Sequence, residues 1–361
     1  MDTPAETSQR KPWSRRKRIL LGCAVFLPCV PLFALVVVLL LASAELRQKI
    51  DSMQVRDEVV FNDPEAVGNG GAVQQKIRSS GHYGGEAIYD VVYTLDGLGR
   101  RVTPVQGSEQ RTRFMAFFGC SFVYGHGVND NETLPYYVGE LCSQYRPYNY
   151  GLRGQSPQRI MEYIQQGRLG EEITEREGIA VYAYIPHHLD RVIGAMPCFN
   201  AWIAEHPYYF LDEAGRLVHG GTFRTGRPWR SRLYDALWDW PVLNWFSFTL
   251  PTKRTREDID LLTAIICASK MSFEQQFPGC PFVFLYFYRN LADPAIKWDD
   301  YLRESVESKG VQFIDATAWQ TEEILSKYLL PDYHPKPVMH KRVAQELVHG
   351  LGLCSAAGPS H

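Results

Sequence analysis

The hydrophobic positions after Arg113 form short continuous runs that are separated by segments with helical periodicity. Four runs are clear and a fifth is weaker: FMAFF (114–118), IAVYAYI (179–185), FVFLYFY (282–288), VQFI (311–314) and the weaker YNY (148–150). Continuous apolar runs of this length are typical of strands that are buried on both faces of a parallel sheet. The pattern therefore predicts about five parallel strands.

Two longer segments show the periodicity of amphipathic helices. Their apolar positions on one side are Ile259, Leu262, Ile266 and Phe273 in residues 256–277, and Val343, Leu347 and Leu351 in residues 338–351. Strands that alternate with helices predict a doubly wound α/β domain, which we place at residues 113–353. In such domains, ligands bind beyond the carboxyl ends of the strands.

An insertion at about residues 195–255 interrupts this alternation. Residues 207–221 are predicted to form a β-hairpin, and the run after them is rich in aromatic side chains: Trp238, Trp240, Trp245, Phe246 and Phe248. We interpret these aromatic residues as a local hydrophobic cluster that covers the sheet. The alternatives are a rim that stacks on sugars and a surface that contacts lipid headgroups.

The region before the α/β domain, residues 45–112, is predicted to be a stalk that leads into an irregular segment. Within it, residues 89–104 contain two β-rich runs on either side of Asp96 and Gly97. An Asp-Gly pair between such runs predicts a hairpin. The last residues, 354–361, are predicted to be a tail.

The N-terminal end of the chain has the pattern of a membrane anchor. Residues 19–44 contain no charged side chain over 26 positions, which is long enough for one transmembrane helix. A cleavable signal peptide is the alternative, because Ala42-Ser43-Ala44 resembles a cleavage site, but its apolar core would span only about 7–15 residues. Six Lys and Arg against two acidic residues make positions 1–18 a basic cytoplasmic tail, so the main domain is expected to be periplasmic or extracellular.

The overall charge and the cysteines bear on two classes of function, nucleic-acid binding and metal binding. The formal net charge of −2 gives no indication of nucleic-acid binding. The eight cysteines form no CxxC pair and HExxH is absent, so the sequence contains no metal-binding motif and no readable disulfide pairing.

A possible nucleophile follows the first strand. In FFGCSFVYGHGV, Ser121 comes directly after the apolar run, and Asp332 and His334 lie two residues apart before the last helical segment. Both positions are expected at the same edge of a doubly wound sheet, where His334 could serve as the base of Ser121 and Asp332 could orient His334. From the residues alone the alternative stays open, in which Asp332 caps the last helix and His334 is a surface residue.

Acyl transfer also requires hydrogen-bond donors for the developing oxyanion. The segment NYGLRGQSPQ (149–158) supplies Gly151 and Gly154 after the second strand. A glycine at such a place lets a backbone N–H approach a substrate oxygen, although an ordinary glycine turn would have the same sequence.

Four segments in this order resemble the SGNH, or GDSL, hydrolase family: FFGCSFVYGHGV, NYGLRGQS, AYIPHHLDR and PDYHPKPVMHKRVAQEL. The resemblance implies a flavodoxin-like three-layer α/β/α fold and serine esterase or acyltransferase chemistry without a metal or an organic cofactor. It implies Ser121, His334 and Asp332 as the catalytic triad, and the backbone N–H groups of Ser121 and Gly154 as oxyanion donors. The family usually places an asparagine in the third segment, where this chain has His187 and His188, and either imidazole could donate in its place.

Together these features predict a membrane-anchored, extracytoplasmic serine esterase or O-acyltransferase. The expected substrates are O-acyl esters, in particular acetyl esters, of an exported glycan or envelope polymer. The alternative is a protein of weak or lost activity that keeps the fold in order to bind a glycan. The expected partners are the membrane and the ester substrate, and the sequence does not indicate an oligomeric state.

Overall fold

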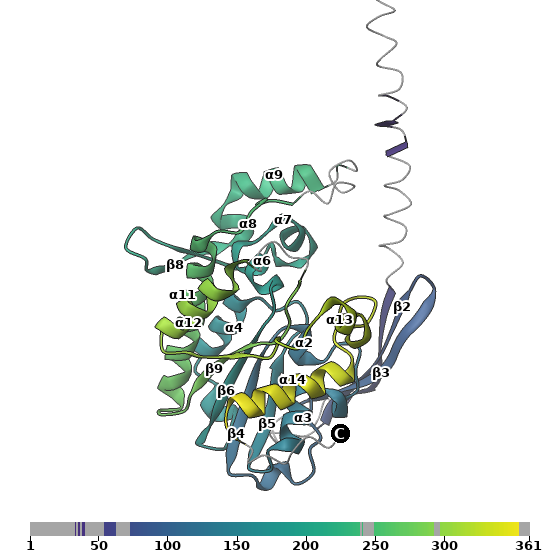
Figure 1. Ribbon diagram of the computed structural model, residues 1–361, viewed down its shortest axis with the longest axis vertical. Helices are drawn as coiled ribbons and strands as arrows, with labels where there is room; N and C mark the ends of the chain where they lie inside the picture. The colour runs from purple at the N-terminus through teal and green to yellow at the C-terminus, as the bar shows by residue number, and fades with distance from the viewer. Residues whose placement is uncertain are drawn as a thin grey trace, which may run out of the picture.

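The computed structural model describes residues 33, 35, 36, 38, 39, 54–62, 73–238, 240, 249–291 and 297–353 (Figure 1). Most of the predicted membrane span and the whole tail at 354–361 lie outside these residues. Among the residues that are described, no helix is both long enough and apolar enough to span a bilayer.

The centre of the fold is a parallel sheet of five strands, and each strand overlaps one of the predicted apolar runs. The strands are β4 (Arg113–Gly119), β5 (Tyr145–Gly151), β6 (Glu177–Tyr184), β9 (Phe282–Tyr286) and β10 (Gln312–Asp315). They lie in the order β10-β9-β6-β4-β5 and all neighbouring pairs are parallel. The prediction of a doubly wound sheet is confirmed, including the weak run at 148–150 that lies in β5.

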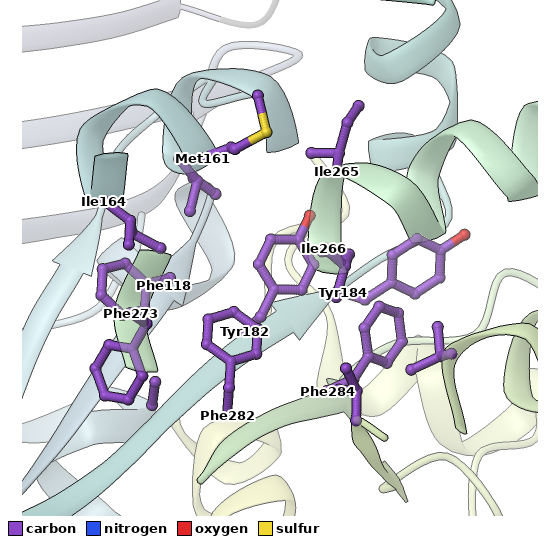
Figure 2. Packing of buried hydrophobic residues seen from close by; sticks show 14 of the residues in the cluster. Phe118, Met161, Ile164, Tyr182, Tyr184, Ile265, Ile266, Phe273, Phe282 and Phe284 are labelled. Atoms are coloured by element: carbon purple, nitrogen blue, oxygen red, sulfur yellow. The ribbon is translucent and has the colours of Figure 1, made fainter. Parts of the chain in front are cut away.

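Helices cover both faces of this sheet, which gives three layers (Figure 1). Successive strand residues point to opposite faces, so Phe114 and Phe118 join one core while Met115 and Phe117 join the other. Figure 2 shows the first core, in which Phe118, Tyr182 and Phe284 of the sheet face residues of two helices. The main covering helices are α4 (Pro157–Gln165), α6 (His187–Ile193), α11 (Arg256–Gln276) and α12 (Asp299–Ser308) on this face, and α3 (Leu134–Leu141), α13 (Glu322–Tyr328) and α14 (Pro337–Gly350) on the other. Both predicted long helices are confirmed as α11 and α14.

A separate antiparallel sheet precedes the α/β domain. It consists of β1 (Gln54–Asn62), β2 (Val73–Tyr83) and β3 (Glu86–Asp96), in that order. The predicted turn after Asp96 is present, with a bridge between Leu95 and Arg101, but the long pairing of β3 is with β2. One face of the sheet packs Tyr89, Val91 and Tyr93 against Tyr124 of the α/β domain.

The insertion forms a small unit with its own core. Its elements are α7 (Met196–Cys198), a π-helix (Phe199–Ile203), β7 (Pro207–Leu211), β8 (Leu217–Thr222), α8 (Phe223–Gly226) and α9 (Pro228–Trp238). The predicted hairpin is confirmed as β7 and β8. Of the predicted aromatic cluster, Trp238 packs partly buried on the insertion core and Trp240 is exposed, whereas Trp245, Phe246 and Phe248 lie outside the described residues.

The cysteines in the described part of the α/β domain are all free thiols: Cys120, Cys142, Cys198, Cys267 and Cys280. The short elements η1 (Ser108–Gln110), α2 (Ser121–Tyr124), η2 (Asp130–Glu132) and α5 (Leu169–Glu172) complete the described chain.

Candidate active site

Ser121 lies at the carboxyl end of β4, which pairs with β5 on one side and β6 on the other, in a turn that leads directly into α2. The turn is tight, because a side chain at Gly119 would come within 2.4 Å of Val123 and one at Gly151 within 2.3 Å of the Tyr124 nitrogen. Ser121 is the first residue of α2, so its backbone N–H has no acceptor within that helix. The side chain is 8% exposed. The sequence thus places one hydroxyl at a protected position on the ligand-binding edge of the sheet.

The structure brings Ser121, His334 and Asp332 into one chain of hydrogen bonds. Ser121 Oγ is 2.9 Å from His334 Nε2, and His334 Nδ1 is 2.9 Å from Asp332 Oδ2. An ionised carboxylate can only accept, so Nδ1 carries the proton and Nε2 is the nitrogen that accepts from the serine hydroxyl. Burial opposes ionisation of Asp332, but the hydrogen bonds and charge of His334 outweigh it and hold the carboxyl pKa below its usual value.

The loop conformation explains how two residues at a spacing of only two can pair. Tyr333, between them, has a φ of +67°, which is uncommon for a residue other than glycine. This turn lets Asp332 Oδ1 accept from the backbone N–H of His334 at 3.2 Å while Oδ2 accepts from its ring. The last helix begins at Pro337 with Lys336 as its N-cap, so the alternative in which Asp332 caps that helix is wrong.

A second histidine, which the sequence analysis did not single out, lies beside the triad. His126 Nε2 is 3.0 Å from the Tyr89 hydroxyl and 3.8 Å from Asp332 Oδ2, and its ring centroid is 4.4 Å from that of His334. Burial, and next the neighbouring His334, lower the pKa of His126 to about 3. His126 is therefore a neutral imidazole that packs against the acid and base pair. Its position five residues after Ser121 is the sequence signal that could have indicated it.

The antiparallel sheet also contacts the segment that follows Ser121. The prediction of a stalk at residues 45–112 did not include these contacts. The Tyr93 hydroxyl accepts from the backbone N–H of Gly127 at 2.9 Å. Asp57 of β1 accepts from Arg153 at 2.6 Å and from Ser79 at 2.6 Å. Residues 54–96 therefore contact both the turn after Ser121 and the loop that contains Gly154.

Arg101 fixes the chain that follows α2. Its side chain is 0% exposed and its guanidinium donates to the carbonyl oxygens of Tyr124, Gly125 and Val128 at 2.5–2.8 Å. Its Nε–H donates to Asp130 at 2.9 Å. Because each of these hydrogen bonds is charge-assisted, the buried guanidinium stabilises the conformation of residues 124–130.

Gly154 lies in the loop after β5 with a φ of +72°, a conformation that favours glycine. The same loop is tied to the nucleophile turn, because Leu152 N donates to the carbonyl of Gly119 at 3.2 Å. The oxyanion roles of Ser121 and Gly154 stay predictions, and the local geometry is compatible with them.

The two histidines of the third segment have different environments. His188 is fully buried, its Nδ1 is 2.8 Å from the Tyr182 hydroxyl and its Nε2 is buried as well, so the prediction of His188 as an oxyanion donor is corrected. The reason is that α6 turns this side chain into the core below the sheet edge, where burial lowers its pKa well below the usual value. His187, the first residue of α6, is exposed and stays the candidate third donor.

One group of side chains in the described residues could in principle hold a metal ion. The potential ligand atoms of His126, Asp332 and His334 all lie within 4.8 Å of one another. Asp332 and His334 are already engaged with each other and with Ser121, which is the arrangement of an acid, a base and a nucleophile.

A cavity of about 470 Å³ lies next to the loop that carries Asp332 and His334. It is lined mainly by apolar side chains of α13 and of that loop, among them Leu325, Leu329, Leu330, Pro331 and Tyr333. Phe122 connects the cavity to the triad, because its ring lies 5.8 Å from both His334 and Tyr288 by centroids.

Comparisons with known proteins give remote structural likenesses. No family model and no curated protein matches the chain. Similar solved structures include a member of the lipolytic protein G-D-S-L family from Veillonella parvula DSM 2008, with 11% identity, a TM-score of 0.38, and coverage of 66% of this chain and 97% of that one.

Two other similar structures are an acetyl xylan esterase from the rumen bacterium Butyrivibrio proteoclasticus and a salicylyl acyltransferase from a tetracycline biosynthetic pathway. The first has 13% identity and a TM-score of 0.38, with coverage of 78% of this chain and 71% of that one. The second has 12% identity and a TM-score of 0.37, with coverage of 83% and 78%. At this level of similarity, the function of the chain has to rest on its own side chains.

Proposed function

We propose that the chain is a membrane-anchored, extracytoplasmic serine esterase or O-acyltransferase that acts on acetyl or related O-acyl esters of an exported glycan or envelope polymer. The observation that carries the chemistry is the pair of 2.9 Å hydrogen bonds that joins Ser121, His334 and Asp332. The location is supported by the uncharged stretch at 19–44 and the basic residues before it. The polymer substrate follows from that location.

In the first step, Ser121 Oγ attacks the acyl carbonyl carbon while His334 Nε2 takes the hydroxyl proton. The new Oγ–C bond forms a tetrahedral oxyanion, and its collapse breaks the bond to the leaving alcohol oxygen, which receives the proton from His334. Asp332 holds the ring and stabilises its positive charge during both events. The products are an acyl-serine and the free alcohol.

In the second step, His334 takes a proton from water or from an acceptor hydroxyl, whose oxygen attacks the acyl carbon. Collapse returns the proton to Ser121 Oγ and releases a carboxylic acid or a new ester. The backbone N–H groups of Ser121 and Gly154, with His187 as a third donor, would stabilise the oxyanion in both steps.

A fluorophosphonate probe tests the nucleophile directly. The full-length protein in detergent should be labelled at Ser121, as located by peptide mass spectrometry, and Ser121→Ala should lose both the label and p-nitrophenyl acetate hydrolysis. Ser156 is a matched control, because it is hydrogen-bonded to His206 Nδ1 at 3.1 Å but is fully buried. Ser156→Ala should keep the label. A folded wild-type protein that neither reacts with the probe nor hydrolyses the ester would contradict the enzyme assignment.

A further inference from the structure

The insertion contains a pocket of about 340 Å³ that has no part in the chemistry described above. Six side chains that characterise it are Phe199, Trp202, Glu205, Arg224, Asp235 and Trp238. This volume is within the usual range of small-molecule sites. Aromatic rings and paired charges line the same pocket, and this combination restricts the class of ligand that the pocket can bind.

Trp202 links this pocket to the candidate active site. A Cβ at Gly154 would lie 3.4 Å from the Trp202 ring, so the ring stands beside the loop that is proposed to bind the oxyanion. Trp202 is 45% exposed and lies on the π-helix Phe199–Ile203, a rare local geometry that often occurs at functional sites.

A buried arginine contacts one side of this ring. The Arg191 guanidinium lies 5.7 Å from the centroid of the Trp202 ring and donates to the carbonyl of Gln155 at 2.7 Å. Arg191 itself is buried. Arg191 therefore lies between the Trp202 ring and the loop that contains Gly154, and contacts both.

The polar side of the pocket consists of groups that can exchange hydrogen bonds with hydroxyls. Arg224 donates to Glu205 at 2.9 Å and to Asp235 at 3.0 Å, and both carboxylates keep about half or more of their side-chain surface exposed. One cation against two carboxylates leaves this wall with a net negative charge, which disfavours phosphate, uronate and other anionic ligands.

We propose that this pocket is a subsite for a neutral sugar ring, which stacks on Trp202 and donates from its hydroxyls to Glu205 and Asp235. The apolar C–H face of a pyranose matches an exposed indole, and its hydroxyls can donate to the two carboxylates. The inference rests on the proposed function and names its alcohol component: a neutral glycan whose acylated residue reaches Ser121 past Gly154.

The test compares a substrate that has a sugar with one that does not. The full-length protein is assayed with p-nitrophenyl acetate and with partially O-acetylated xylotriose, cellotriose and chitotriose. We expect Trp202→Ala to raise KM for at least one acetylated trisaccharide about tenfold more than it raises KM for p-nitrophenyl acetate, which has no sugar to stack on the ring. Trp202→Phe should restore part of the affinity.

Trp229 is the matched control, because it is a more exposed tryptophan of the same insertion, at 71%, and does not line the pocket. Trp229→Ala should leave both substrates unaffected. A wild-type enzyme that cleaves p-nitrophenyl acetate but none of the trisaccharides, or a Trp202→Ala variant with unchanged KM for them, overturns the subsite and leaves the esterase intact. A wild-type protein that does not hydrolyse p-nitrophenyl acetate would instead contradict the proposed function.

Discussion

Replacement of Asp332 by Asn removes one negative charge from the proposed triad and keeps the shape of the side chain. The structure gives the size of the effect. Asp332 Oδ2 is 2.9 Å from His334 Nδ1, so the charge of a protonated ring is centred about 4 Å away. At an effective dielectric constant of about 20, this attraction is about 4 kcal/mol, which corresponds to about 10³ in rate. An amide can also donate to Nδ1 and stabilise the wrong tautomer of His334, so we expect kcat to fall by about 10³ to 10⁴.

The assay is hydrolysis of p-nitrophenyl acetate by Asp332→Asn, His334→Ala and the double variant. Asp332 acts only through His334, so the double variant should be no slower than His334→Ala alone. Circular dichroism and the unfolding midpoint show whether each variant is folded. An Asp332→Asn enzyme with more than a tenth of the wild-type kcat, or losses that multiply in the double variant, would refute this role of Asp332.

Three further predictions concern the support of the site. Arg101→Met should lower the free energy of unfolding, measured by urea denaturation, by about 3–5 kcal/mol, because it leaves Asp130 without its buried partner. The exposed pair of Arg113 and Glu177 is the control, and Arg113→Met should lower the free energy of unfolding by less than about 1 kcal/mol. Tyr333→Val should reduce ester hydrolysis and Tyr333→Gly should preserve it, because only glycine accepts a φ of +67° without strain; equal activities would contradict this. Burial lowers the pKa of both His126 and His340 from 6.5 to about 3, so between these pH values the unfolded chain binds more protons than the folded chain, and stability falls as the pH drops below about 6.5. The free energy of unfolding, measured by denaturation, should be lower at pH 5 than at pH 7 by about 2 kcal/mol per histidine. The difference between the two pH values should be smaller in His340→Leu than in the wild type.

The parallel sheet could be predicted from the sequence because buried strands leave a local signal. Strands β4, β6 and β9 each contain a continuous apolar run, and a run of this kind can be recognised without knowledge of its neighbours. In β5 and β10 the apolar positions are interrupted or fewer, and their signal is weaker. The same fold rule brought Ser121 and His334 together across 213 positions, since loops at the carboxyl ends of parallel strands share one edge. The pairing of Asp332 with His334 depends on the positive φ of Tyr333, which a tyrosine does not indicate in the sequence.

The support of the site could not be predicted, because its signals are contacts between distant polar residues. Tyr89 and His126 are 37 positions apart, and Asp57 and Arg153 are 96 apart. Charged and apolar residues mix in β1 without clear alternation, so nothing in QVRDEVVFN indicates that Asp57 holds Arg153. The choice between His187 and His188 was open for a similar reason: the rotation of α6, which buries His188, is set by packing and not by the two residues themselves.

Side chains from the region before residue 113 contact the residues around the proposed triad. Asp332 is enclosed on one side by His334 and on the other by His126, and His126 is held by Tyr89 of β3. The turn after α2 is held by Tyr93 and Arg101, which also lie before the α/β domain in sequence. A change in the antiparallel sheet would therefore shift the groups that fix Asp332 and Ser121, because close-packed interiors transmit displacements. Residues 73–101 belong to the same physical unit as the proposed triad, and a chain that began at β4 would contain Ser121, His334 and Asp332 without the side chains that hold them in place.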